Sequence, residues 1–213
     1  MKYEVLAPGM VYYKNAIPDP EKTIEIIELM QSKLEAGADS AAEKWGEWNG
    51  SNPDLEKFCL KHQILDPSKI SDRDPLYDEI CLVYNNIFKG IDNAFQHYSN
   101  KIYPAASPNI KATEGILSIL KYLKAGYLPP HQDQGISSRV LSTVGYLNED
   151  YDGGEIHFPY LDITIKPEAG SVVFFPSNFI YVHEVKPMAR GIRYAVPQWY
   201  HSLEDIRYST GEE

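Results

Sequence analysis

The chain has 213 residues and a formal net charge of −10, with 20 Lys and Arg against 30 Asp and Glu. That length suits one domain with a sizeable core, and the acidic balance argues against nucleic-acid partners, which need a Lys- and Arg-rich surface. No apolar run approaches the roughly 20 residues of a membrane span, and the start carries no apolar signal stretch, so we expect a cytoplasmic protein with no membrane partner.

Residues 1–110 are predicted to form a mainly helical layer. Asp19 and Pro20 suit the start of a helix, and Gly37 suits its end in a left-handed cap. Asp74-Pro75 repeats the start signal, and apolar residues recur after it at helical spacing. This second stripe consists of Leu76, Ile80, Val83, Ile87, Ile91 and Phe95. We expect both helices to face the core.

Residues 111–203 are predicted to form the β-rich core of the same single domain, 1–213. The predicted strands are 116–122, 140–147, 154–158, 163–166, 171–175, 181–185 and 192–199. Many short strands with Gly- and Pro-rich turns are typical of a sandwich or jelly roll. The fold class is therefore mainly β with supporting helices (α+β).

A candidate metal site begins at His131-Gln132-Asp133. On a strand, residues i and i+2 point to the same face, so His131 and Asp133 can share one metal. The pair alone is a weak signal, but His183 offers a third ligand from a later strand. Two histidines and one carboxylate form the facial triad of non-haem Fe(II) oxygenases, which leaves positions open for cosubstrate and dioxygen. The neighbouring strand residue His157 is predicted to face away.

A candidate anion site is Arg193, in Gly191-Ile192-Arg193-Tyr194. Its guanidinium could hold a carboxylate through two hydrogen bonds. Taken alone, the residue is better explained by a surface salt bridge.

Several motifs resemble the Fe(II)/2-oxoglutarate-dependent dioxygenases, within them the prolyl-4-hydroxylase-like group. They are Leu120-Lys121-Tyr122, Pro130-His131-Gln132-Asp133, Gly145-Tyr146-Leu147-Asn148, Asp152-Gly153-Gly154-Glu155, His183-Glu184-Val185 and Arg193-Tyr194-Ala195. The resemblance implies a double-stranded β-helix (jelly roll, cupin-like) with N-terminal helices packed on one sheet. It implies that His131, Asp133 and His183 bind Fe(II) and that Arg193 holds the far carboxylate of 2-oxoglutarate. Tyr122 and Tyr146 match tyrosines that contact this cosubstrate in relatives, with a purely structural role as the alternative.

The resemblance also implies a reaction. Relatives use O2 and decarboxylate 2-oxoglutarate to succinate and CO2, with ascorbate as the reductant. The retained Asp133 favours hydroxylation over halogenation, and we expect the substrate to be a peptidyl proline, as in a prolyl 4-hydroxylase. Trp45, Trp48 and the loop 134–139 are candidate contacts to a peptide or protein, and the acidic net charge favours basic or neutral peptides.

Two alternatives remain open. The same chemistry could act on a free amino acid or another small molecule. The domain could instead be a catalytically silent β-helix that binds a metal or a partner. The sequence leaves the oligomeric state open.

Overall fold

The computed structural model describes residues 1–48, 59–104, 110–112, 116–135 and 138–202. The strands are β1 (Lys2–Ala7), β2 (Met10–Lys14), β3 (Gly46–Glu47), β4 (Cys59–Leu65), β5 (Ile110–Ala112), β6 (Ile116–Tyr122), β7 (Leu128–His131), β8 (Arg139–Tyr146), β9 (Asp152–Gly153), β10 (Ile156–Phe158), β11 (Ile163–Ile165), β12 (Val172–Pro176), β13 (His183–Val185), β14 (Met188–Arg190) and β15 (Arg193–Ser202). The helices are α1 (Pro20–Glu35) and α2 (Tyr77–His97), with the short turns η2 (Pro67–Lys69), η3 (Tyr98–Ile102) and η5 (Phe179–Tyr181). The mainly β fold class with supporting helices is confirmed.

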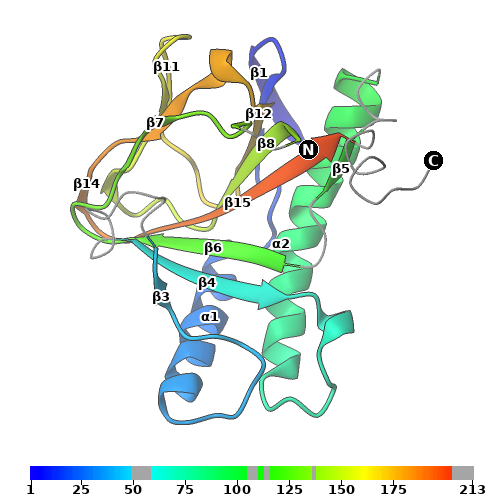
Figure 1. Ribbon diagram of the computed structural model, residues 1–213, viewed down its shortest axis with the longest axis vertical. Coiled ribbons are helices and arrows are strands. Elements are labelled where there is room, and N and C mark those ends of the chain that lie inside the picture. The colour runs from blue at the N-terminus through cyan, green and yellow to red at the C-terminus, as the bar shows by residue number, and fades with distance from the viewer. Residues whose placement is uncertain (49–58, 105–109, 113–115, 136–137, 203–213) are drawn as a thin grey trace.

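Two sheets form the body of the molecule (Figure 1). The larger has nine strands in the order β1-β2-β12-β8-β15-β6-β4-β3, with β5 beside β15. The smaller has four strands in the order β11-β10-β13-β7, and β14 and β9 form a separate pair. Helices α1 and α2 cover one face of the larger sheet, and the smaller sheet lies on its other side.

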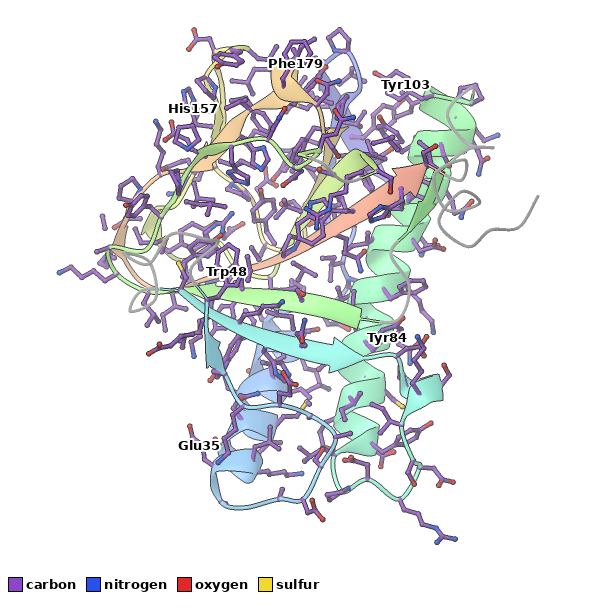
Figure 2. All side chains as sticks on the ribbon, in the orientation of Figure 1. Glu35, Trp48, Tyr84, Tyr103, His157 and Phe179 are labelled. Atoms are coloured by element: carbon purple, nitrogen blue, oxygen red, sulfur yellow. The ribbon has the colours of Figure 1, made fainter. Side chains whose placement is uncertain are left out.

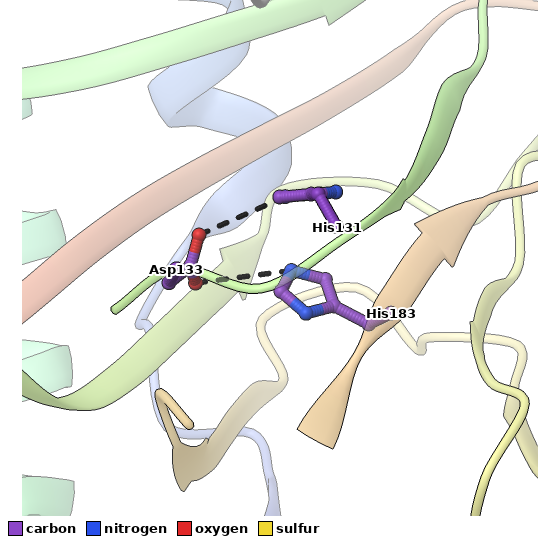
Figure 3. A group of neighbouring side chains, drawn as sticks. All are labelled: His131, Asp133 and His183. Carbon is purple, nitrogen blue, oxygen red and sulfur yellow. Dashed lines mark ion pairs between the residues drawn. The ribbon is translucent and has the colours of Figure 1, made fainter. Parts of the chain in front are cut away.

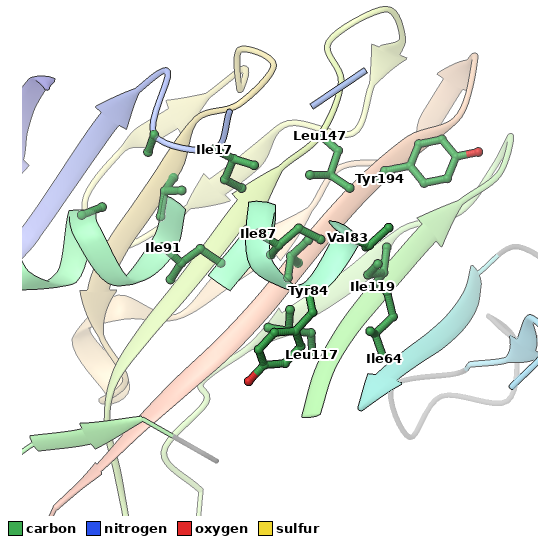
Figure 4. Close-up of a cluster of buried hydrophobic side chains, with 14 of the residues drawn as sticks. Ile17, Ile64, Val83, Tyr84, Ile87, Ile91, Leu117, Ile119, Leu147 and Tyr194 are labelled. Carbon is green, nitrogen blue, oxygen red and sulfur yellow. The ribbon is translucent and has the colours of Figure 1, made fainter. Parts of the chain in front are cut away.

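The alternation of side chains on β12 shows how the larger sheet separates two cores. Val172 and Phe174 point toward α1 and α2, while Val173 and Phe175 point toward the smaller sheet. Val83, Ile87 and Ile91 of α2 fill the helical side (Figure 4). The strands of the larger sheet are therefore buried on both faces near its centre.

The helix starts differ in detail from the prediction. Asp19 occupies the N-cap of α1, but its side chain makes no capping bond, and Thr23 Oγ1 donates to the Asp19 carbonyl oxygen instead. Helix α2 begins at Tyr77 rather than at Asp74-Pro75. The Asp74 carboxylate accepts the backbone N–H groups of Leu76 and Ala41, so it ties the turn before α2 to the segment that follows α1.

The prediction of a mainly helical layer for residues 1–110 missed the strands β1, β2 and β4, which belong to the larger sheet. Strand β2 is buried on both faces, so its residues show no alternation of apolar and polar types. Strand β1 is an exposed edge strand and carries no buried face. Among the described residues, no helix is long and apolar enough to cross a membrane.

One carboxylate of α1 connects the helical layer to two central strands. Glu28 Oε1 accepts a hydrogen bond from Lys121 Nζ of β6 at 2.9 Å and another from Tyr194 Oη of β15 at 2.8 Å. Lys121 and Tyr194 are register partners in the β6–β15 pair. The two strands are therefore joined side by side through α1 as well as through their backbones.

A buried histidine between the larger sheet and α1 is expected to make the free energy of unfolding depend on pH. His62 of β4 is fully buried against Gln31, and burial lowers its pKa to about 4. A histidine in the unfolded chain has a pKa near 6.5, so between pH 4 and pH 6.5 the unfolded chain binds more protons than the folded one. The contribution of neutral His62 to the free energy of unfolding is therefore fully present above about pH 6.5 and is lost as the pH falls toward 4. We expect His62 to account for about 2 kcal/mol of lost unfolding free energy between pH 7 and pH 5.

Urea unfolding at pH 7 and pH 5 measures this contribution. The His62→Leu variant should lose about 2 kcal/mol less than the wild type over this interval, whatever its stability at pH 7. An identical pH dependence in both proteins would show that His62 does not remain neutral in the folded state.

Candidate functional site

Two neighbouring strands of the smaller sheet bring the predicted metal ligands together. His131 at the end of β7 lies directly opposite His183 at the start of β13, and Asp133 follows His131. The Asp133 carboxylate oxygens lie 3.7 Å from His131 Nε2 and 3.8 Å from His183 Nε2 (Figure 3). One candidate ligand atom from each residue lies within 4.8 Å of the other two, so the three could surround one metal ion.

Backbone carbonyls orient both imidazoles. Nδ1 of His131 lies 2.9 Å from the Pro129 carbonyl oxygen, and Nδ1 of His183 lies 3.1 Å from that of Tyr181. Each Nδ1–H can donate there, which leaves each Nε2 lone pair for a metal. Burial lowers the pKa of His183, and the neutral imidazole that results is the form that binds metals.

His157 is not part of this group, as predicted. It lies on β10, where its neighbours Ile156 and Phe158 point into the core. The His157 Nδ1 atom is 2.8 Å from Thr164 Oγ1 on β11, outside the metal-ligand group.

The predicted anion site is a buried cation. Arg193 is 1% exposed and lies opposite Tyr122 in the β6–β15 pair. Its guanidinium carbon is 4.7 Å from the Tyr122 ring centroid and 5.1 Å from that of Tyr146. Within the described residues no carboxylate pairs with Arg193, and its Nε and Nη1 atoms have no hydrogen-bond partner. A buried guanidinium without an anion fits a ligand that brings its own carboxylate.

The two tyrosines beside Arg193 stay protonated, because burial raises the pKa of both phenols. Tyr122 lines the same cavity as Arg193 and the metal ligands. Tyr146 does not line it, and its buried hydroxyl has no partner among the described residues. Tyr122 is therefore exposed to the cavity, while Tyr146 packs against Arg193 without lining the cavity.

The cavity has a volume of about 490 Å³, within the usual range for small-ligand sites. His131, Asp133, His183, Arg193 and Tyr122 all line it. Much of the remaining wall is apolar, formed by Leu120, Leu128, Val144, Ile156, Val185 and Ala195. The cavity can therefore hold a metal ion and an anionic ligand beside a largely apolar wall.

The two tryptophans singled out in the sequence have different positions. Trp48 lines the cavity and packs edge-on against Tyr122, with ring centroids 6.4 Å apart (Figure 2). Trp45 is on the helical side of the sheet, 5.5 Å from the His62 ring. Residues 136 and 137 of the predicted contact loop lie outside the described residues.

Sequence reasoning did not identify Trp199 as a cavity residue. Arg193, Ala195, Pro197 and Trp199 alternate along β15, and all four line the cavity. Because side chains alternate between the two faces of a strand, counting every second residue from Arg193 could have predicted that Trp199 lies on the same face. Arg139, at the start of β8, lines the wall beside Trp199.

Residues 117–201 match the model of the 2OG-Fe(II) oxygenase superfamily. The chain is 39% identical over 80 residues to prolyl 3-hydroxylase 2 of Mus musculus, a match that covers 32% of this chain and 11% of the relative. It is 40% identical over 57 residues to a PKHD-type hydroxylase of a Synechococcus strain, which covers 26% of this chain and 25% of that protein. The chain thus spans only a small part of these relatives.

Solved structures extend the likeness to nearly the whole chain. A prolyl hydroxylase of Trichoplax adhaerens, in complex with a hypoxia inducible factor peptide fragment, matches with a TM-score of 0.63 and 17% identity, over 94% of this chain and 87% of that one. A Pseudomonas putida prolyl-4-hydroxylase matches with a TM-score of 0.55 and 20% identity, over 91% and 92%. At these identities the likeness shows the fold, and the double-stranded β-helix is confirmed.

Proposed function

Through residues 117–201 the chain belongs to the 2OG-Fe(II) oxygenase superfamily, and we propose that it hydroxylates proline residues of peptides or proteins. One observation carries the proposal. A single cavity holds three candidate metal ligands, His131, Asp133 and His183, together with the guanidinium of Arg193, which has no carboxylate partner among the described residues. Reactions of this superfamily require both a metal and a dicarboxylate cosubstrate, and the cavity has groups suited to each.

The residues have distinct proposed roles. His131, Asp133 and His183 would hold Fe(II), and Arg193 would pair with the far carboxylate of 2-oxoglutarate. The protonated phenol of Tyr122 would donate a hydrogen bond to the same cosubstrate. Bound Fe(II) with 2-oxoglutarate and O2 supplies the oxidising chemistry, which yields succinate and CO2 beside the hydroxylated product.

The protein itself positions these groups and keeps the site dry. The carbonyls of Pro129 and Tyr181 fix the imidazole orientations, and the two tyrosine rings hold the Arg193 guanidinium between them. The apolar wall excludes water around the reacting carbon. A saturated proline ring suits such a wall, and the lining residues Trp48 and Trp199 offer aromatic surface to it.

The substrate class also has support from the relatives, several of which are named as prolyl hydroxylases. The names of these relatives differ in the ring carbon that is hydroxylated, which is position 3 in one set and position 4 in another. The proposal for this chain is proline hydroxylation, with position 4 as the sequence-based expectation.

Mass spectrometry tests the proposal. Proline-containing peptides are incubated with enzyme, Fe(II), ascorbate, 2-oxoglutarate and O2, and the products are hydrolysed to separate 3- and 4-hydroxyproline. We expect a gain of one oxygen on proline that depends on 2-oxoglutarate and is abolished in Asp133→Ala. Succinate release tightly coupled to a free amino acid, with no peptide oxidation across a broad panel, would overturn the peptide substrate.

A further inference from the structure

The first strand of the chain leaves one edge of the larger sheet open. Within the described residues the larger sheet ends in β1 and β3, and the smaller sheet ends in β11 and β7. Strand β3 has two residues and β11 has three, while β7 contains Pro129 and Pro130, which lack the backbone N–H that pairing with a further strand uses. Strand β1 has six residues and no proline, so of these four edges it is the one suited to accept another strand.

One face of β1 is apolar although it is about half exposed. Met1, Tyr3 and Val5 occupy every second position, so their side chains point to the same face. Their exposed fractions are 56%, 48% and 50%. The Tyr3 ring centroid lies 5.0 Å from that of His97 at the end of α2, so this face is on the helical side of the sheet. Large apolar side chains in a row on an open edge are typical of a surface that pairs with another chain.

The other face of β1 carries one cation and one anion, Lys2 and Glu4, both exposed. A second copy of the same strand can meet both charges and the apolar face at once. If two antiparallel β1 strands are related by a two-fold axis at Tyr3, the two Tyr3 residues lie opposite each other. One position to either side, Lys2 of each copy then faces Glu4 of the other, and two positions away Met1 faces Val5. Opposite charges and apolar pairs directly across two strands stabilise the pairing.

Other symmetric registers leave one of the faces unsatisfied. Residues directly opposite each other in antiparallel strands point to the same face, so the axis must pass beside a residue and not between two. An axis at Lys2 or at Glu4 places that charge opposite its own copy, and like charges in this position destabilise a strand pair. An axis at Val5 places Glu4 opposite the apolar Leu6 and Lys2 opposite Pro8, which lies outside β1.

We propose that two copies of the chain form a dimer through β1, with the strands antiparallel and the two-fold axis at Tyr3. The backbone groups on the two open edges then bond to each other, and the larger sheet continues from one copy into the next. An interface built on a single pair of strands is small, so we expect a dissociation constant of about 1–100 µM. None of the residues that line the cavity belongs to β1, so the dimer leaves the proposed function independent of it.

Charge reversal tests the dimer and its register together. Sedimentation velocity of the untagged full chain is measured over about 1–200 µM for the wild type, Lys2→Glu, Glu4→Lys and the double variant Lys2→Glu/Glu4→Lys. The matched control is Lys22→Glu, an exposed lysine of α1. Circular dichroism should show every variant folded.

Each single reversal turns both cross-strand ion pairs into like-charge pairs, so it should weaken the dimer about 10-fold or more. The two single variants change the net charge in opposite directions, so net charge cannot explain a loss in both. The double variant restores opposite charges across the axis and should dimerise within about 2-fold of the wild type, as should Lys22→Glu.

Disulfide cross-linking reads the register independently. In a Cys81→Ser background, which leaves only the buried Cys59, Tyr3→Cys places two thiols opposite each other at the axis. Their Cα atoms are then about 4.5–5.5 Å apart, within reach of a disulfide, and oxidation should give a covalent dimer. Val5→Cys in the same background should not cross-link, because its two copies lie four positions apart along the pair, or roughly 14 Å.

Three results would overturn the proposal. The first is a wild type that stays monomeric at about 200 µM, where a dimer of the expected affinity must form. The second is a dimer that both single reversals leave as strong as Lys22→Glu does, since the copies would then meet through another surface. The third is cross-linking of Val5→Cys in place of Tyr3→Cys, which would place the axis elsewhere on β1.

Discussion

Replacing His183 by alanine is expected to weaken Mn(II) binding by more than about 100-fold. Loss of a residue that only orients a metal ligand already costs about 10- to 100-fold in affinity, and His183 would be a ligand itself. The residue is buried beside Asp133 and His131, the other two members of the candidate ligand group. Isothermal calorimetry with Mn(II) measures the loss, and succinate release with Fe(II) should disappear in parallel.

The matched control is His157→Ala, a histidine of the adjacent strand whose ring contacts Thr164 instead of the metal group. It should keep the affinity of the wild type, and circular dichroism should show both variants folded. Equal loss of affinity in the two variants would contradict the ligand assignment.

Replacing Arg193 by alanine is expected to raise the apparent constant for 2-oxoglutarate at least about 30-fold, since truncating one member of a buried charge pair costs 2 kcal/mol or more. Metal affinity should change much less. The unliganded variant should be as stable as the wild type or more so, because the wild type keeps a buried guanidinium that has no carboxylate partner among the described residues.

Thermal unfolding separates these effects. Excess 2-oxoglutarate with Mn(II) should raise the midpoint of the wild type and of Arg190→Ala, but not that of Arg193→Ala. A variant that retains the full shift and an unchanged 2-oxoglutarate dependence would show that another group holds the distal carboxylate.

The strands of the C-terminal half could be predicted because turn residues bound them. Gly170 precedes β12 and Pro176 is its last residue, and the four residues Val172-Val173-Phe174-Phe175 are all apolar. The three candidate metal ligands could also be predicted from the sequence. His131 and Asp133 lie only two residues apart, and one distant histidine completes the set. The missed strands have no such local signal, because β2 pairs with β12 from the other end of the chain and is buried on both faces.

Some cavity residues could likewise be predicted from local sequence patterns, and others could not. A turn lies between His183 and Arg193, so the alternation of side chains along a strand could not show whether the two residues share a face. Only the family resemblance therefore suggested the role of Arg193. Among the described residues Arg193 has no carboxylate partner, and Arg139 stacks on Trp199; both observations depend on how groups far apart in sequence come together. Tyr146 matched the family pattern, yet its position behind Arg193 depends on how the sheets pack.

The contact of Glu28 with Lys121 and Tyr194 indicates that the N-terminal helices and the catalytic strands fold as one unit. Lys121 is next to Tyr122 in β6, and Tyr194 is next to Arg193 in β15. The Glu28 carboxylate of α1 bonds to Lys121 and Tyr194, so it helps to fix the relative position of the two strands that carry the candidate cosubstrate residues. The family match begins at residue 117, after both helices and after β1, β2 and β4. A fragment cut to that match would leave Phe174 and Val196 without their covering helices. The segment that carries the chemistry is therefore not autonomous, and the N-terminal layer is part of the smallest piece able to support it.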